Sequence, residues 1–185
     1  MKSNVGFRDA CQAQLITNPE LIRSFLLKGR WSFDHIRDGK IIHRESWENL
    51  ITNAGLDHIL DVVLSAGSQL TTWYVGLISA TPTVAAGDTM SSHAGWTEVT
   101  TYSNANRVTW TDAGVSAQSI TNSASPASFN INGTVTVGGA FLTSNNTKGG
   151  TTGTLLSAKA FSGGNRSFIS GDELRVTATY NAANG

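Results

Sequence analysis

The sequence lacks the residues that build a covalent or metal-held framework. One cysteine, Cys11, occurs among 185 residues, so the chain cannot form an internal disulfide and offers no zinc-ligand spacing. We expect a free thiol in a reducing compartment. A chain of this length can bury a core that holds the fold without crosslinks.

Long apolar runs and net charge are missing as well. No run approaches the roughly 20 apolar residues that span a membrane, and the first fifteen residues contain no apolar segment of the kind a signal peptide needs. Lys and Arg together number 13, as do Asp and Glu, so the formal net charge is zero. Nucleic-acid binding usually needs a basic excess. We therefore expect neither a membrane nor a nucleic acid as a partner.

Charged residues are scarce and unevenly spread. They make up 14% of the chain, where about 25% is usual, and most of them precede Gly67. Beyond that point Thr, Ser, Asn and Gly predominate, which is typical of β-sheet faces and turns. This shift predicts three segments: an N-terminal arm with a short helix (1–29), a hairpin plus a helix that is packed on the sandwich or part of it (30–67), and a β-sandwich (68–185).

One or two short helices are predicted near the N-terminus. The first begins at the capping sequence Asn18-Pro19-Glu20 and ends before Gly29. Its apolar stripe consists of Leu21, Ile22, Phe25 and Leu26. This helix is short, so it needs a surface to lie on, in its own domain or on a neighbouring subunit. The second has Asn53 as its N-cap and ends at Gly67, and its stripe consists of Leu56, Ile59, Leu60, Val63 and Leu64.

Between these helices the sequence predicts a β-hairpin. Two apolar-polar alternating runs flank Asp38-Gly39, a dipeptide that favours a tight hairpin turn. Trp31, Phe33 and His35 would then share one face of the first strand. His35 and His43 would lie opposite each other across the turn.

From Thr71 onward the pattern is that of strands separated by polar loops. The candidates are 73–79, 95–102, 107–112, 129–142, 154–161 and 173–180, with a flexible loop expected at 144–153. Short strands with turn signals between them indicate a β-sandwich or a barrel, and the fold class that we expect is a mainly β, antiparallel sandwich.

The stretch from Phe129 to Leu142 is the most regular of these candidates. Apolar and small polar residues alternate along it, as in a half-buried strand. Asn132-Gly133 favours a hairpin turn, but such a turn would place Ile131 and Val135 on opposite faces. We therefore predict one long strand, bent or bulged at a glycine.

No motif for chemistry is found along the chain. The four histidines have no metal-ligand spacing with one another or with carboxylates, and the carboxylates near glycines fit turns better than calcium sites. No serine lies in a nucleophile elbow, and no glycine-rich loop connects a strand to a helix as phosphate binding requires. We predict no catalytic, cofactor or metal site, and a protein that is not an enzyme.

Aromatic residues leave one alternative open. Trp73, Trp96 and Trp110 lie on predicted strands, where aromatic side chains normally belong to the core. An aromatic platform for carbohydrate at the surface is the other reading.

Several blocks of the sequence together resemble a known family. They are NLITNAGLDHILDVVL, WYVGLI, AAGDTMSSHAGWTEVTTYSNANRVTW, SITNSASPASFNING, GGAFLTSNNTKGGTTGTLLSAKAF and SGDELRVTATY. In this order and spacing, over roughly residues 30–181, they resemble small structural proteins of tailed bacteriophages. The family members with this pattern are capsid cement or decoration proteins with a jelly-roll-like β-sandwich.

The resemblance implies a non-enzymatic virion protein at the capsid surface, made and assembled in the host bacterial cytoplasm. It would bind the outside of the major capsid protein lattice and copies of itself, as a dimer or trimer, and cement the capsid against internal DNA pressure. The expected contact residues come from the N-terminal region: Leu21, Ile22, Phe25, Leu26, Trp31 and Phe33. The alternative is a tail, neck or head-fibre component, for which a glycan- or receptor-binding role is open.

Overall fold

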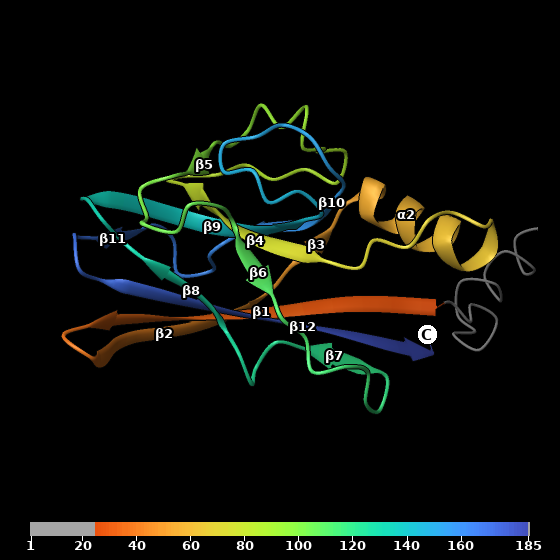
Figure 1. The fold of residues 1–185 in the computed structure, drawn as a ribbon, viewed down its shortest axis with the longest axis horizontal. Coiled ribbons are helices and arrows are strands. Elements are labelled where there is room, and N and C mark those ends of the chain that lie inside the picture. Colours follow the sequence, from red (N-terminus) through yellow and green to blue (C-terminus); the bar gives the residue numbers. More distant parts are fainter. Residues whose placement is uncertain (1–24, 185) are drawn as a thin grey trace, which may run out of the picture.

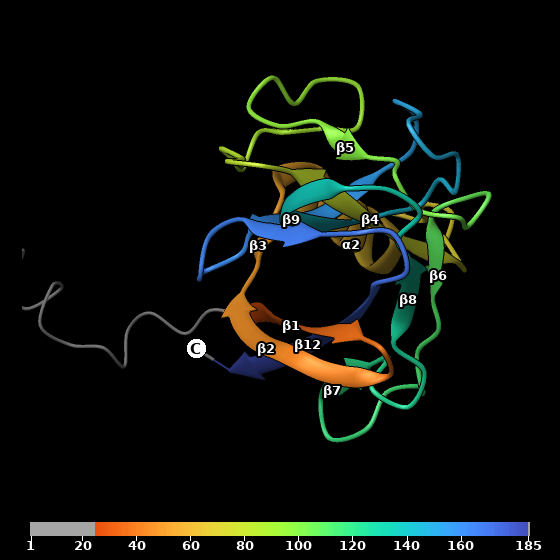
Figure 2. The same cartoon turned by 90° about the vertical axis from the view of Figure 1, so that its left-hand side faces the viewer.

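The computed structural model describes residues 25–184, which form two antiparallel sheets packed face to face, with one helix at one end (Figures 1 and 2). The first sheet contains β1 (Phe25–Arg37), β2 (Lys40–Glu48), β7 (Ser119–Thr121), β8 (Ala127–Asn130) and β12 (Glu173–Asn184). The second contains β3 (Leu50–Ile51), β4 (Trp73–Ser79), β5 (Glu98–Val99), β6 (Val108–Trp110), β9 (Val135–Thr143), β10 (Leu155–Ala160) and β11 (Arg166–Phe168). The helix is α2 (Asn53–Leu64). The predicted β-sandwich is confirmed.

The centre of the first sheet joins the beginning and the end of the described chain. β1 pairs with β12 over its length, from Phe25 opposite Asn184 to Ile36 opposite Glu173. β2 pairs with the other edge of β1 through the predicted turn, where Asp38 and Gly39 both have positive φ. The hairpin is therefore built into the sandwich.

The prediction of a helix before Gly29 is wrong for the part of it that the structure describes. Phe25 and Leu26 are the first residues of β1, opposite Asn184 and Ala183 of β12; Leu21 and Ile22 lie outside the described residues. A short apolar run fits a helix and a buried strand equally well. Here the long β12 supplies backbone hydrogen-bond partners, so the extended form prevails.

The central stretch is also not one strand. β8 ends at Asn130 in the first sheet and β9 begins at Val135 in the second, so the chain changes sheets between them. Ile131 forms an isolated bridge with Tyr102 at this crossing. Strands often change sheets through such bends at sandwich corners. Alternation persists on both sides because each half turns its apolar face to the same core.

The core between the sheets is rich in aromatic side chains. Trp31 and Phe33 point inward from β1, each only 1% exposed, and Phe33 stacks on Phe161 at 4.4 Å between ring centroids. Trp47 of β2 completes the cluster, 4.9 Å from Phe161. A smaller core on the outer face of the second sheet packs Met90 and Trp96 against its strands. That sheet is thus buried on both faces.

Candidate binding surface

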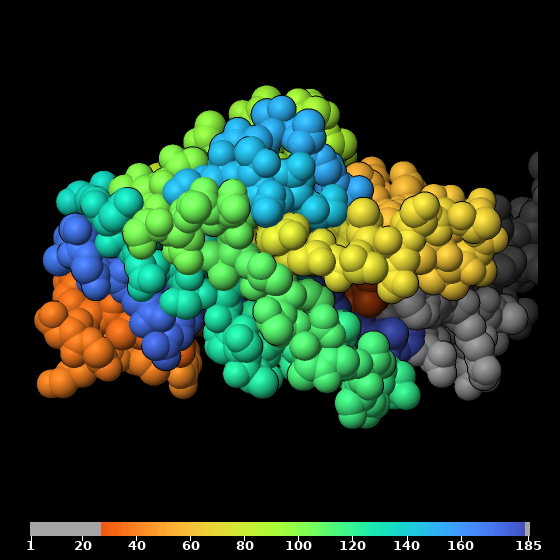
Figure 3. Space-filling view, viewed as in Figure 1, coloured from red at the N-terminus to blue at the C-terminus, as the bar shows by residue number. Residues whose placement is uncertain are grey.

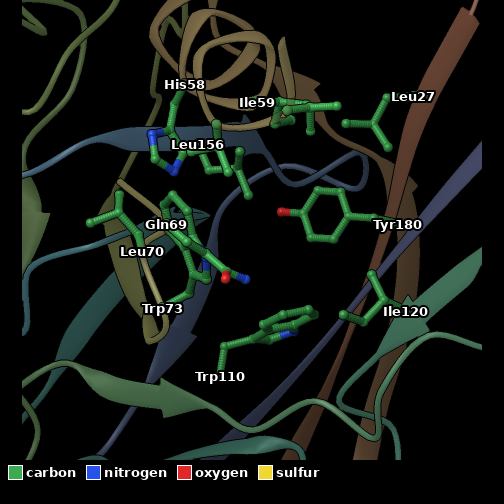
Figure 4. Close-up of a pocket in the computed structure, with 12 residues that line it drawn as sticks. Leu27, His58, Ile59, Gln69, Leu70, Trp73, Trp110, Ile120, Leu156 and Tyr180 are labelled. Atoms are coloured by element: carbon green, nitrogen blue, oxygen red, sulfur yellow. The ribbon is translucent and has the colours of Figure 1, made fainter. Parts of the chain in front are cut away.

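The end of the sandwich beside α2 is open and forms an apolar cleft of about 310 Å³. Figure 4 shows side chains from both sheets and from the helix pointing toward its centre. They include Leu27, Ile120 and Tyr180 from the first sheet, Trp73, Trp110 and Leu156 from the second, and Ile59 from α2. We call this opening the end cleft. In the space-filling view, α2 and the loop after it form the upper part of this end of the molecule (Figure 3).

The first turn of α2 fixes the helix above the cleft. Thr52 is the N-cap, one residue earlier than predicted, and its hydroxyl accepts a hydrogen bond from the Gly55 N–H at 3.1 Å. The same hydroxyl donates to the carbonyl of Leu155 on β10. Gly55 is the buried residue of the helix, and a Cβ at this position would clash with the backbone of Leu156. The helix backbone therefore lies directly on β10.

The rest of α2 turns its apolar residues to the outside. The predicted helix and stripe are present, but only Ile59 packs against the core. The other members are 42% to 78% exposed: Leu56, Leu60, Val63 and Leu64. We call these four residues the α2 stripe. A contiguous exposed apolar surface of this kind marks an interaction site.

Two polar groups beside the end cleft are hydrogen-bonded within the protein. The Tyr180 hydroxyl is hydrogen-bonded to Ser157, and the Trp110 indole N–H donates to the Ala178 carbonyl at 3.3 Å. Burial raises the pKa of Tyr180, which keeps the phenol neutral. The imidazole of His58 packs edge-on against Trp73, 5.7 Å between ring centroids. The cleft thus presents hydrocarbon and aromatic walls, which suit apolar side chains.

The predicted contact residues are distributed unevenly around this surface. Phe25 and Leu26 lie in β1 at the same end of the molecule as the end cleft. Trp31 and Phe33 belong to the core and do not reach the surface. Sequence reasoning missed Leu27, which lines the cleft. Had the segment been interpreted as a strand, alternation back from Trp31 and Phe33 would have placed Leu27 on the same inward face.

The tryptophan side chains do not form an exposed platform of the kind that binds carbohydrate. All five fall within the described residues, and none is exposed: Trp31, Trp47, Trp96 and Trp110 are buried and Trp73 is half-buried in the end cleft. They serve the core, as strand aromatics usually do.

A buried charged cluster lies at the other end of β1. Asp172 receives two hydrogen bonds from Arg37, both at 2.7 Å, and one from the Ile169 N–H at 2.9 Å. Its Oδ2 also lies 2.9 Å from Nε2 of His35, whose ring packs on Phe168. The bonds from Arg37 hold the pKa of Asp172 well below its usual range, whereas burial lowers the pKa of His35. This cluster ties β1 to the turn before β12.

The predicted pairing of His35 with His43 is confirmed as strand register, since the two residues are opposite each other in β1 and β2. Their rings have different partners, however: His43 lies 3.4 Å from Glu45. Within residues 25–184, no group of three or more His, Cys, Asp or Glu side chains is arranged to hold a metal ion. Nor is any helix in that range long and apolar enough to cross a membrane.

Comparison of the sequence with protein-family models and with curated proteins finds no match in either set. The function is therefore argued from the end cleft and the α2 stripe.

Proposed function

We propose that this protein is a non-enzymatic structural component of a phage virion that binds the outside of the major capsid protein lattice and cements it against the pressure of packaged DNA. The observation that carries the proposal is the α2 stripe beside the end cleft. Together they form an adhesive apolar surface at one end of a sandwich. The resemblance of the sequence to phage cement proteins supplies the partner.

Burial of this surface supplies a free energy comparable with the cost of association. Burying one exposed aliphatic side chain contributes roughly 1.5–3 kcal/mol. The α2 stripe offers four such side chains, so its burial contributes several kcal/mol per copy, of the order of the ordering costs of association. A symmetric shell repeats the contact many times, and the summed contribution opposes separation of the capsomers.

The rest of the molecule suits a passive clamp. Two cores lie on the two faces of the second sheet, and β1 and β12 are paired along almost their whole length. Charges on the outer face of the first sheet form pairs, such as Asp34 with Arg44 and Glu173 with Arg175. A rigid, neutral body transmits force between its contacts without attracting DNA.

The test is the heat stability of virions prepared with and without the protein. Virions without it should release DNA at a lower temperature, because fewer contacts hold the capsomers together. Adding back the Leu60→Glu/Leu64→Glu protein should fail to restore the temperature, since charge on the α2 stripe opposes burial. Equal release temperatures for complete and depleted virions would overturn the proposal.

The matched control is Ile41→Glu. Ile41 is 50% exposed, comparable with Leu60, but lies beside the hairpin turn at the opposite end from α2 (Figure 1). This variant should restore the release temperature in full. If the control also failed to restore the release temperature, the loss of heat stability in the α2 variant could not be assigned to this surface.

A further inference from the structure

We propose that the end cleft and the α2 stripe of one copy receive the N-terminal segment of a second copy, with Leu21 and Ile22 as the side chains that enter. The inference rests on the proposed function: among copies bound to the capsid lattice, this surface would join one copy of the protein to the next. The segment in question, residues 1–24, precedes the described fold.

The point where the chain enters the fold supports this occupant. The described chain begins at Phe25, which is paired with Asn184 at the end of β12. Two residues later, Leu27 lines the end cleft. The origin of the N-terminal segment and the cleft therefore lie at the same end of the molecule. A segment of 24 residues can reach on the order of 80 Å when extended, so a neighbouring copy is well within range.

The direction of β1 favours a second copy over the segment's own cleft. β1 stays paired with β12 up to Phe25, and only Arg23 and Ser24 separate it from Ile22. A return to the molecule's own cleft would require a reversal within these two residues, neither of which is a glycine or proline. The turn-forming pair Asn18-Pro19 comes before Leu21. The pairing of β1 up to Phe25 therefore favours the cleft of a second copy.

Two copies that meet at this end can bury each other's apolar surface. A twofold axis beside the end cleft places each N-terminal segment next to the partner's α2, so the same contact is made twice. The space also fits. An apolar cavity of roughly 150 Å³ holds a benzene molecule, and the end cleft, at about 310 Å³, has room for two aliphatic side chains. Its apolar walls match leucine and isoleucine in chemistry.

Mixing two single-cysteine proteins tests the inference directly. One is the full chain with Cys11→Ser and Ile22→Cys, and the other carries Cys11→Ser and Val63→Cys. Val63 belongs to the α2 stripe and also lines the cleft. Mild oxidation of the mixture should give a disulfide-linked heterodimer, seen on a non-reducing gel and located by mass spectrometry, because each protein holds only one thiol. Ile22→Glu in the otherwise natural chain should weaken self-association by roughly tenfold or more.

The control replaces Val63→Cys by Ile41→Cys, an exposed position at the opposite end of the molecule. Heterodimer that does not exceed this control overturns the inference. So does a crosslink confined to one chain when Ile22→Cys and Val63→Cys are combined, which would show that the segment covers its own cleft. Dimers linked through Val63→Cys alone would mean that α2 pairs with α2 instead.

The heat-release experiment is independent of this one. If no heterodimer forms but virions still lose heat stability without the protein, only the occupant is wrong. If the heterodimer forms but virions without the protein are as heat-stable as complete ones, the contact between copies is supported and the cementing function is wrong.

Discussion

At the scale of single residues, the buried charges hold loops and strands that the hydrophobic core does not reach. Arg107 is 2% exposed, pairs with Glu98 at 2.7 Å and donates to the carbonyls of Asn145 and Gly150. Lys148 donates to the Tyr102 carbonyl at 2.9 Å and lies over the ring of that tyrosine. The loop at 144–153, expected from its composition to be flexible, is held at both of these points.

The buried pair of His35 and Asp172 gives the protein a defined pH dependence. With Nε2–H donating to Asp172, the Nδ1 atom of neutral His35 faces no polar partner among the described residues. Protonation would bury an unpaired N–H there, which agrees with the lowered pKa of His35. The ordinary histidine pKa is about 6.5, so below that pH the unfolded chain takes up the proton before the folded one.

We therefore expect the free energy of unfolding to decrease as the pH falls below about 6.5, and to decrease further below about 4, where the unfolded state protonates Asp172 while the folded state does not. Urea denaturation at a series of pH values measures both steps. His35→Gln keeps a donor for Asp172 but cannot titrate, so it should flatten the step that begins near pH 6.5 and leave the one that begins near pH 4. An unchanged upper step in this variant would contradict the assignment.

These residue-scale features were only partly predictable. The inward face of Trp31, Phe33 and His35 followed from alternation, because a strand turns every second side chain the same way. The partners of His35 and Arg107 did not follow, because they lie 137 and 9 residues away, and a separation in sequence does not say which side chains meet.

At the scale of elements, α2 is held by its first turn and leaves the α2 stripe exposed. Gly55 allows the close approach to β10, because the carbonyl of Leu156 occupies the space that a side chain would fill. The helix cannot move away without breaking the Thr52 hydrogen bonds to its own first turn and to Leu155. This contact sets the position of the α2 stripe.

Gly55→Ala tests that contact. In an exposed helix this change stabilises by about 1 kcal/mol, but here the clash should outweigh it and destabilise by roughly 1–3 kcal/mol, as overpacking of a core does. Thermal unfolding measures the difference. Gly87→Ala is the control, since nothing lies within 4 Å of a Cβ at that position, and it should unfold close to the natural protein. Gly55→Ala with equal or higher thermal stability would show that α2 is not pinned to β10.

The periodicity of the sequence predicted which elements form, but not what each element packs against. The strand 73–79 and the helix stripe from Leu56 to Leu64 were predicted from spacing alone, and both are present. Spacing could not tell which face of α2 meets the core, nor that the run from Phe129 changes sheets. At Phe25 and Leu26 it gave the wrong element, because the pairing partner lies at the far end of the sequence.

At the scale of the whole molecule, four of the eight large apolar side chains that are exposed in the described chain form the α2 stripe, at one end. The α2 stripe, the end cleft and the first residue of β1 lie together there, while the hairpin turn marks the opposite end (Figure 1). The formal net charge is zero, which suits a protein that stays outside the capsid and away from the DNA. Under the proposed function, the protein would act through many copies, since each contact would contribute only a few kcal/mol.

Copy number per virion is therefore the most direct measurement of the central claim. Quantitative mass spectrometry of purified virions should find the protein on the order of hundreds of copies, in a fixed simple ratio to the major capsid protein, as a repeated lattice contact requires. A few copies per virion would contradict the account and indicate a tail, neck or head-fibre component.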